Sequence, residues 1–290
     1  MFEHPTIRAI SDYLQGNFVK EETSDEKIYE PPKTSLDDIE KVDVFPKNIL
    51  LTGVTGFLGS HVLSEIITNF HNSKIYCIIR SKPNKTYTER LTEILHNYFD
   101  EKYDLLIGNQ IIPIEGDLTR DNLGINITLY KELIGKIDSV INCASLVKHF
   151  GDYNLFYNTN VTSVRNIIKF AKESGAKINH ISTTSVSGNY LVENNIIFNY
   201  TENNFYIGQN YKDNVYVRTK FEAENELFKA ITEGVKVNVF RIGNLMQRCS
   251  DGMFQINKFD NAYYKRIYGF IKIRKNTFKS FNTKTRVYTC

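Results

Sequence analysis

Three glycines spaced three residues apart follow an apolar run near position 50, and they constrain the fold more than any other feature of the chain. Residues 49–52 form the run, Gly53, Gly56 and Gly59 follow it, and an apolar helical pattern begins at Phe57. Glycines at this spacing permit a tight strand-to-helix turn whose backbone approaches a diphosphate, and a helix N-terminus favours an anion. A turn without a ligand can have the same sequence, so the interpretation depends on the rest of the chain.

Strands and helices are predicted to alternate between residues 47 and 241. Most of the apolar runs are nearly continuous, as in a parallel sheet covered by helices on both faces. The chain is therefore predicted to be an α/β protein with a doubly wound parallel sheet of the Rossmann type. The expected strands are 48–52, 74–79, 110–115, 137–143, 178–182 and 235–241, and the expected helices are 58–70, 88–99, 158–174 and 215–232.

The composition is that of an ordinary globular protein, since 41% of the 290 residues are hydrophobic and the net charge is +3. This charge gives no support to a nucleic-acid partner, and no apolar run is long enough to span a membrane. The N-terminus lacks a signal-peptide layout and the four cysteines are scattered, which predicts a cytoplasmic protein without a metal site. Residues 257–274 mix aromatic and basic side chains, and we expect a helix packed on the sheet domain, with single-stranded nucleic acid as the weaker alternative.

Two short segments precede the alternating region. Residues 1–15 place apolar side chains on one helical face, in a segment too short to fold without a partner surface. Residues 16–46 are polar and acidic, which is typical of a linker. We therefore expect a linker at 16–46 and one domain over 47–290, with residues 1–15 either a docking helix or the end of another domain.

The ends of the later strands carry residues suited to a dinucleotide. Arg80 ends the second predicted strand, where an arginine suits a 2′-phosphate and a carboxylate would bind a free 2′-hydroxyl, so NADP is favoured over NAD. Asp117 follows the third strand and could accept a hydrogen bond from adenine or cap the next turn. Asn142 and Ala144 end the fourth strand beside Cys143, which we expect to be a small packed residue rather than a nucleophile.

A tyrosine and a lysine four residues apart supply the strongest chemical signal. Tyr216 and Lys220 share one face of a predicted helix. A phenol is a poor acid–base group at neutral pH, and a nearby ammonium would lower its pKa toward the working range. Upstream, the hydroxyl cluster 182–187 follows a buried strand, where a further donor could hold a substrate carbonyl oxygen. A tyrosine and a lysine at this spacing also occur in solvated helices, and a hydroxyl cluster also occurs where a strand leads into a polar loop. These structural explanations become weak once the glycine turn and Arg80 are counted with them.

Together these features resemble an extended short-chain dehydrogenase/reductase. The motifs that carry a narrower resemblance are Thr52-Gly53-x-x-Gly56-x-x-Gly59, Tyr216-x-x-x-Lys220, Val147-Lys148-His149-Phe150-Gly151, Thr201-Glu202-Asn203 with Gly208-Gln209, and Arg241-Ile242-Gly243-Asn244-Leu245-Met246. Over about residues 47–270 they resemble the thioester reductase domain of nonribosomal peptide synthetases, aminoadipate reductases and carboxylic acid reductases. The segment Phe2-Glu3-His4-Pro5-Thr6-Ile7 resembles the C-terminal end of a carrier domain, which would make residues 1–15 a carrier remnant.

The resemblance implies a role for each matching residue. Tyr216 would donate a proton, Thr183 would hold the carbonyl oxygen with it, and Lys220 would also bind the nicotinamide ribose. Thr183 is chosen because it stands five residues before Gly188. The glycines would seat the diphosphate. The cofactor-binding residues implied are Gly53, Thr55, Gly56, Phe57, Leu58, Gly59, Arg80, Asp117, Leu118, Asn142, Ala144 and Lys220, with no metal.

The implied activity is the NADPH-dependent release of an acyl or peptidyl thioester, bound to the phosphopantetheine of a carrier domain, as an aldehyde, with further reduction to the alcohol left open. Family members continue into a C-terminal lobe over the substrate, and we expect this substrate lobe to be truncated, incomplete from about residue 245. The alternatives are a fatty acyl-CoA reductase, another extended reductase such as a nucleotide-sugar epimerase or dehydratase, and a truncated, non-catalytic NADP-binding module.

Overall fold

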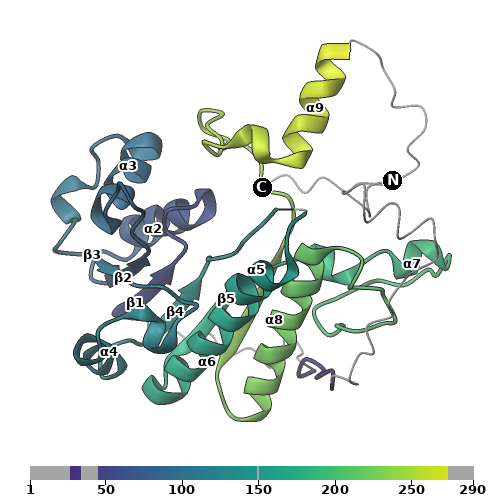
Figure 1. Cartoon of the computed structure of the whole chain (residues 1–290), viewed down its shortest axis with the longest axis horizontal. Helices are drawn as coiled ribbons and strands as arrows, with labels where there is room; N and C mark the ends of the chain where they lie inside the picture. The colour runs from purple at the N-terminus through teal and green to yellow at the C-terminus, as the bar shows by residue number, and fades with distance from the viewer. Residues whose placement is uncertain (1–26, 34–44, 149, 274–290) are drawn as a thin grey trace. The chain divides into compact units, whose positions relative to one another are not determined.

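The computed structural model describes residues 27–33, 45–148 and 150–273. Six parallel strands form one sheet in the order β3-β2-β1-β4-β5-β6 (Figure 1). The strands are β1 (Asn48–Thr52), β2 (Lys74–Ile79), β3 (Ile111–Glu115), β4 (Ser139–Asn142), β5 (Lys177–Thr183) and β6 (Val237–Ile242). The helices of the same unit are α2 (Phe57–Asn69), α3 (Tyr87–Phe99), α4 (Ile127–Ile134), α5 (Tyr153–Tyr157), α6 (Ser163–Ser174), α7 (Tyr190–Glu193) and α8 (Val215–Thr232).

This architecture confirms the predicted doubly wound parallel sheet. Every strand lies within about two residues of its predicted ends, because buried parallel strands are continuous apolar runs. The predicted helix at 158–174 is longer in the structure, since α5 and a π-helical segment, Asn158–Thr162, precede α6. Helix α4 is not predicted from the sequence. It has only eight residues, and its start is marked by Asn126, whose side chain accepts a hydrogen bond from the Thr128 amide.

Side chains that alternate along the strands divide the core between the two faces of the sheet. Ile49 and Leu51 pack with the apolar sides of α2 and α3 on one face. Leu50 points to the other face, where it belongs to a cluster with residues of α4, α6 and α8. A third cluster, formed by Val186, Phe205, Phe221 and Phe228, lies against α8. The two faces hold β1 and β4 firmly, and their carboxyl ends form the site described below.

Part of the predicted linker is attached to α8. The Asn225 side chain accepts a hydrogen bond from the Tyr29 amide at 2.8 Å and donates one to the Lys27 carbonyl at 3.0 Å. Ile28 and Tyr29 pack against the third cluster. A polar composition therefore did not prevent residues 27–33 from contacting the domain. The expected carrier remnant at 1–15 lies outside the described residues.

A second compact unit begins at Met246. Its described part contains α9 (Ala262–Ile273), which confirms a helix in the aromatic and basic stretch. Tyr264 and Tyr268 stack on one another, and Phe259 meets both edge-on. The packing of this helix on the sheet stays a prediction. Among all the helices that the structure describes, none has the length and apolar character needed to cross a membrane.

Candidate functional site

A cavity of about 240 Å³ opens at the carboxyl edge of the sheet, beside the ends of β1, β2, β3 and β4. We call it the turn cavity. It lies where the strand order reverses between β1 and β4, the position at which doubly wound sheets bind ligands. Seven of the residues predicted to bind cofactor line it: Gly53, Thr55, Gly56, Arg80, Asp117, Leu118 and Ala144.

The glycine turn forms the floor of the turn cavity from backbone alone. Gly53 has a φ of +72°, and a Cβ there would lie 2.5 Å from the Cys143 carbonyl carbon. A Cβ on Gly59 would lie 2.2 Å from the Gly53 oxygen, so this glycine lets α2 pack directly on the turn. Gly56 is the N-cap of α2, and its amide donates to the Gly53 carbonyl at 2.9 Å. A helix N-terminus therefore meets the cavity with no side chain between them, an arrangement suited to a diphosphate.

Two arginines stand at the end of β2. Arg80 lines the turn cavity as expected, and Arg90 from α3 lines it too. The Arg90 guanidinium donates to the Arg80 carbonyl and, at 3.2 Å, to the Thr55 hydroxyl. Burial and the positive charge of Arg80 lower the pKa of Arg90. Two cations held this close favour an anion between them, which fits the phosphate group predicted for this corner.

Asp117 has the capping role that the sequence left open. Its carboxylate accepts hydrogen bonds from the Thr119 amide at 3.0 Å and the Thr119 hydroxyl at 2.8 Å. It also lines the turn cavity together with Leu118, whose side chain is buried. The second carboxylate oxygen lies 3.9 Å from Arg120. The cap fixes the carboxylate at the cavity wall, so capping and a contact with adenine are compatible.

The other predicted cofactor residues do not line the turn cavity. Phe57 packs its ring on His61, 4.5 Å between centroids, and Gly59 lies under the turn. Asn142 is buried, with its side chain bonded to neighbouring residues as described below. Leu58 and Lys220 also lie outside the lining. For these five residues the structure indicates support for the turn or the neighbouring chemistry, rather than a side chain that faces the cavity.

Asn160, in the π-helical segment, holds the loop that follows β4. Its carboxamide oxygen accepts from the Leu146 amide at 2.7 Å and the Ser145 hydroxyl at 3.1 Å. Its nitrogen donates to Thr219 on α8 at 3.0 Å. Because π-helical turns interrupt the regular ladder, they commonly occur at functional sites. Here the turn connects the cavity wall at Ser145 with the helix that carries Tyr216.

Thr183 and Tyr216 are brought together by the structure. Thr183 ends β5, and Tyr216 lies in the first turn of α8, after the Asn214 cap. A hydrogen bond between their side chains lowers the pKa of Tyr216, but burial has the larger effect and raises it. The predicted lowering of this pKa by Lys220 is therefore absent here. The tyrosine is a neutral hydroxyl, which can donate a proton or a hydrogen bond.

Lys220 makes its polar contacts with other groups, and it is not among the causes that shift the pKa of Tyr216. Its ammonium nitrogen lies 2.7 Å from the Ile181 carbonyl and 3.2 Å from His180 Nε2. The side chain is 2% exposed, and burial lowers its pKa to about 8, while Glu224 and Cys143 act in the opposite direction. A one-turn spacing therefore places Tyr216 and Lys220 on one face without making their polar atoms partners.

Cys143 connects the turn cavity with Lys220. It lines the turn cavity, and its thiol lies close enough to Lys220 for each to influence the pKa of the other. Burial raises the pKa of the Cys143 thiol to about 12. A thiol that stays protonated is a poor nucleophile, in agreement with the expected packing role.

The sequence interpretation missed Arg90, Asn160 and His180. The only sequence signal for Arg90 is a basic residue near the start of the helix after the second strand. Asn160 sits inside an apparently regular helix, and His180 inside a buried strand, where a lone polar residue gives no indication of its partners.

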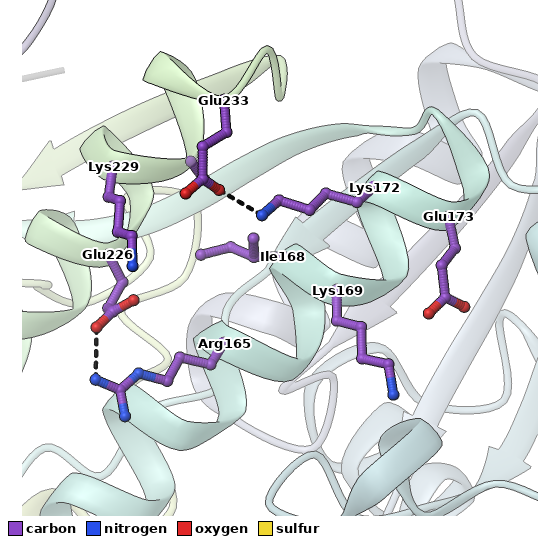
Figure 2. A pocket seen from close by; sticks show the side chains of 9 residues that line it. Arg165, Ile168, Lys169, Lys172, Glu173, Glu226, Lys229 and Glu233 are labelled. Carbon is purple, nitrogen blue, oxygen red and sulfur yellow. Dashed lines mark hydrogen bonds and ion pairs between the residues drawn. The ribbon is translucent and has the colours of Figure 1, made fainter.

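A second cavity, about 380 Å³ in volume, lies between α6 and α8 (Figure 2). Charged side chains from the two helices cross it in pairs, Arg165 with Glu226 and Lys172 with Glu233. None of the predicted site residues lines it. Its paired charges are those of a solvated groove between two helices.

Comparison with known proteins supports the geometry. Residues 51–285 match the NAD-binding family described as Male sterility protein. Among solved structures, the thiolation-reductase di-domain of an archaeal non-ribosomal peptide synthetase is 41% identical, with a TM-score of 0.70 over 78% of this chain and 47% of that chain. The resemblance to thioester reductase domains is thereby confirmed.

Curated relatives include two kinds of reductase. The L-2-aminoadipate reductase large subunit of Candida glabrata is 27% identical over 64% of this chain and 15% of its own length. Fatty acyl-CoA reductase 8 of Arabidopsis thaliana is 31% identical over 49% of this chain and 32% of its own length. The chain therefore spans about a third or less of the curated relatives that it matches.

Proposed function

Because the chain belongs to the male sterility protein family of NAD-binding domains, we propose that it acts as an NADPH-dependent thioester reductase. The substrate is an acyl or peptidyl thioester on the phosphopantetheine arm of a carrier domain, in an assembly of the nonribosomal peptide synthetase type. The product is an aldehyde and the free thiol. Residues 1–15 are then the end of the carrier domain, and 16–46 are the connection to the reductase at 47–290.

The residues of the turn cavity fit a dinucleotide phosphate. Gly53 and Gly59 let the turn pack closely on the backbone of Cys143 and on itself, so the turn can present main chain and the N-terminus of α2 to a diphosphate. Arg80 and Arg90 supply two positive charges for a 2′-phosphate, and Asp117 is fixed where adenine would lie. This pair of arginines favours NADPH over NADH. When bound, NADPH supplies the hydride.

The groups around the substrate carbonyl belong to this chain. Thr183 and Tyr216 would donate hydrogen bonds to the carbonyl oxygen and stabilise the negative charge that develops there. Tyr216 would give its proton to that oxygen as the carbonyl carbon is reduced, and the thioester would become a hemithioacetal. Its collapse breaks the carbon–sulfur bond, and the thiol leaves with the proton. Lys220 would leave the Ile181 carbonyl to bind the ribose.

The observation that carries this proposal is that Cys143 connects the turn cavity with Lys220. A backbone seat for a diphosphate and a buried tyrosine–threonine pair occur in many folds, but here one residue borders the cavity and also influences Lys220. Similarity to a thiolation-reductase di-domain at 41% identity favours a carrier-bound thioester as the substrate. The attachment of residues 27–33 to α8 would hold the connection to the carrier close to the domain.

A fatty acyl-CoA reductase is the second candidate, because relatives of that name are about 30% identical over half of the chain. The chemistry is the same, and only the thioester carrier differs. The test offers the same acyl group on a phosphopantetheinylated carrier and on coenzyme A, and follows NADPH oxidation and thiol release. We expect kcat/KM to be at least about tenfold higher for the carrier-bound substrate. A preference for coenzyme A would assign the second function, and binding of NADPH without its oxidation by either substrate would leave only a binding module.

A further inference from the structure

A chain of buried side chains connects the end of β1 to Lys220. It runs from Thr52 through Asn142 and His180 to the lysine, and we call these residues the Lys220 network. The Thr52 hydroxyl lies 2.6 Å from Asn142 Oδ1, Asn142 Nδ2 lies 3.0 Å from His180 Nδ1, and His180 Nε2 lies 3.2 Å from Lys220 Nζ. Each of these residues is at most 2% exposed. Because an unmatched donor is costly in a network this buried, the members of the network decide which atoms donate and which accept.

One backbone amide shows which atoms of the network donate hydrogen bonds and which accept them. The Ala144 N–H donates to Asn142 Oδ1 at 3.2 Å, and a backbone amide has no other role than donor. The oxygen of Asn142 must therefore face Ala144, and its NH₂ group must face His180. His180 Nδ1 is then the acceptor of that hydrogen bond. Burial and the nearby Lys220 lower the pKa of His180, so the ring is neutral and carries its single proton on Nε2.

That proton points at Lys220. A lysine ammonium has three donors and no acceptor, so an ammonium would meet the Nε2–H of His180 donor to donor. A neutral amine has a lone pair that can accept the Nε2–H, and it still donates to the Ile181 carbonyl at 2.7 Å. Besides His180 on β5, the titratable groups in the described part of the chain that affect Lys220 are Cys143 after β4 and Glu224 on α8. Of these, Glu224 and Cys143 favour the ammonium.

We propose that Asn142 and His180 are positioning residues that act through Lys220, by presenting the His180 Nε2–H to Nζ and so favouring the neutral amine while the site is empty. The inference rests on the proposed function in one respect, that Lys220 is the residue that serves the cofactor and Tyr216. A lysine kept near its point of titration can give and take a proton at neutral pH, as the recovery of the Tyr216 proton after each turnover requires.

The first test observes the tautomer directly. Nitrogen NMR of the cofactor-free protein, labelled with ¹⁵N-histidine and compared with a His180→Gln variant for assignment, reports which ring nitrogen of His180 carries the proton. We expect a neutral ring protonated on Nε2. A ring protonated on Nδ1, or a charged ring at neutral pH, would overturn the proposal.

The second test reverses the polarity of the network. Asn142→Asp replaces the donor with an acceptor, and Asn142→Leu removes the donor without adding a charge, so in both variants the His180 proton can move to Nδ1 and Nε2 can accept from an ammonium. We expect the pKa of Lys220 to rise by about one unit or more in both. It is measured by ¹³Cε-lysine NMR titration of the cofactor-free protein, with Lys220→Arg for assignment. An unchanged or lower pKa in both variants would contradict the network.

Two further variants separate the network from a general disturbance. Thr52→Val removes one bond to Asn142 but leaves the Ala144 amide to orient it, so the pKa of Lys220 should stay within about 0.3 units of the wild-type value. In a His180→Leu background, Asn142→Asp should raise the pKa of Lys220 by less than half as much as it does in the wild-type background, because only the through-space charge remains. The proposal would be overturned if the rise in the pKa of Lys220 kept half or more of its size in that background. It would also be overturned if Thr52→Val raised this pKa as much as Asn142→Asp does. None of these titrations needs cofactor or turnover, so their failure would leave the proposed reductase function untouched.

Discussion

The turn cavity and the Lys220 network are neighbours built in opposite ways. The glycine turn at the cavity is main chain, and its missing Cβ atoms let it pack closely on the neighbouring backbone. The network is made of buried polar side chains that satisfy one another, Thr52 to Asn142 to His180 to Lys220. A backbone seat is rigid and already shaped for its ligand. A side-chain network depends on its partners, and here Lys220 donates to the Ile181 carbonyl.

The difference teaches that binding and chemistry have separate structural requirements in this chain. The glycine turn depends on the absence of a Cβ at Gly53 and Gly59, and Lys220 depends on polar partners that come from another element, β5. Variants should therefore divide into those that remove binding and those that remove turnover. The following predictions run from the largest expected effect to the smallest.

Tyr216→Phe should separate turnover from binding most sharply. Removing the hydroxyl removes the proton donor, and general acid catalysis typically contributes about 10²- to 10⁴-fold, so kcat should fall by that order. The NADPH dissociation constant, from cofactor fluorescence, should change by less than about threefold. Tyr206→Phe, in a tyrosine that is about half exposed, is the matched control and should keep full activity. Loss of binding together with turnover would show that Tyr216 has a structural role.

Lys220→Met tests the buried charge through pH-dependent stability. The pKa falls from 10.5 in the unfolded chain to about 8 in the folded one, which corresponds to on the order of 3 kcal/mol. The unfolded state binds more protons between these values, so the wild type should gain stability as pH rises from about 8 to about 10.5. Urea unfolding of both proteins across this range should show the wild type rising relative to the variant. A constant difference would contradict the buried, easily deprotonated lysine.

Gly59→Ala should damage the seat and leave the network intact. The added Cβ would lie 2.2 Å from the Gly53 oxygen, so α2 must move away from the turn at a cost of about 1–3 kcal/mol. We expect NADPH affinity to fall at least about tenfold, with a lower unfolding temperature. Gly135→Ala, where the nearest atom would be 3.7 Å away, is the control. Wild-type affinity in Gly59→Ala would mean that the diphosphate does not lie on this turn.

Arg80→Gln and Arg90→Gln should change cofactor choice. Each variant removes one charge from the 2′-phosphate corner, so NADPH affinity should fall about tenfold while NADH affinity changes by less than about twofold. Titration of both cofactors against Lys131→Gln, on α4, gives the control. An equal fall in the affinities for NADPH and NADH would mean that these arginines do not contact the 2′-phosphate.

Asn225→Ala should have the smallest effect, because it touches neither half of the site. It removes the two hydrogen bonds to the backbone of residues 27–33, worth about 1 kcal/mol, and should lower the unfolding temperature by about 2–4 °C. Protease cleavage near Tyr29 should become faster. Asn69→Ala, whose bonds are confined to its own helix, is the control. Unchanged cleavage would mean that the attachment contributes nothing.

The sequence predicts the sheet well because its signals are local. The strands of a buried parallel sheet are apolar runs, and the glycine turn of Gly53, Gly56 and Gly59 has a fixed spacing. Residues adjacent to these signals, such as Arg80 and Asp117, follow from their place at strand ends and do line the cavity.

The rest of the site depends on tertiary contacts that spacing does not encode. Tyr216 and Lys220 share a helix face, but the direction of the Lys220 amine is set by His180 and the Ile181 carbonyl on another element. Burial reverses the expected shift in the pKa of Tyr216 for the same reason. Arg90 and Asn160 come from helices whose sequences show regular periodicity and no mark of their contacts.

The most direct test of the account is transfer of the label from NADPH deuterated at its reactive carbon to a carrier-bound acyl thioester. The account predicts one deuterium at the aldehyde carbon, one free thiol for each NADPH oxidised, and product formation at least about 10²-fold slower with Tyr216→Phe. Thiol release without NADPH oxidation, or an aldehyde without the label, would contradict hydride transfer at this site.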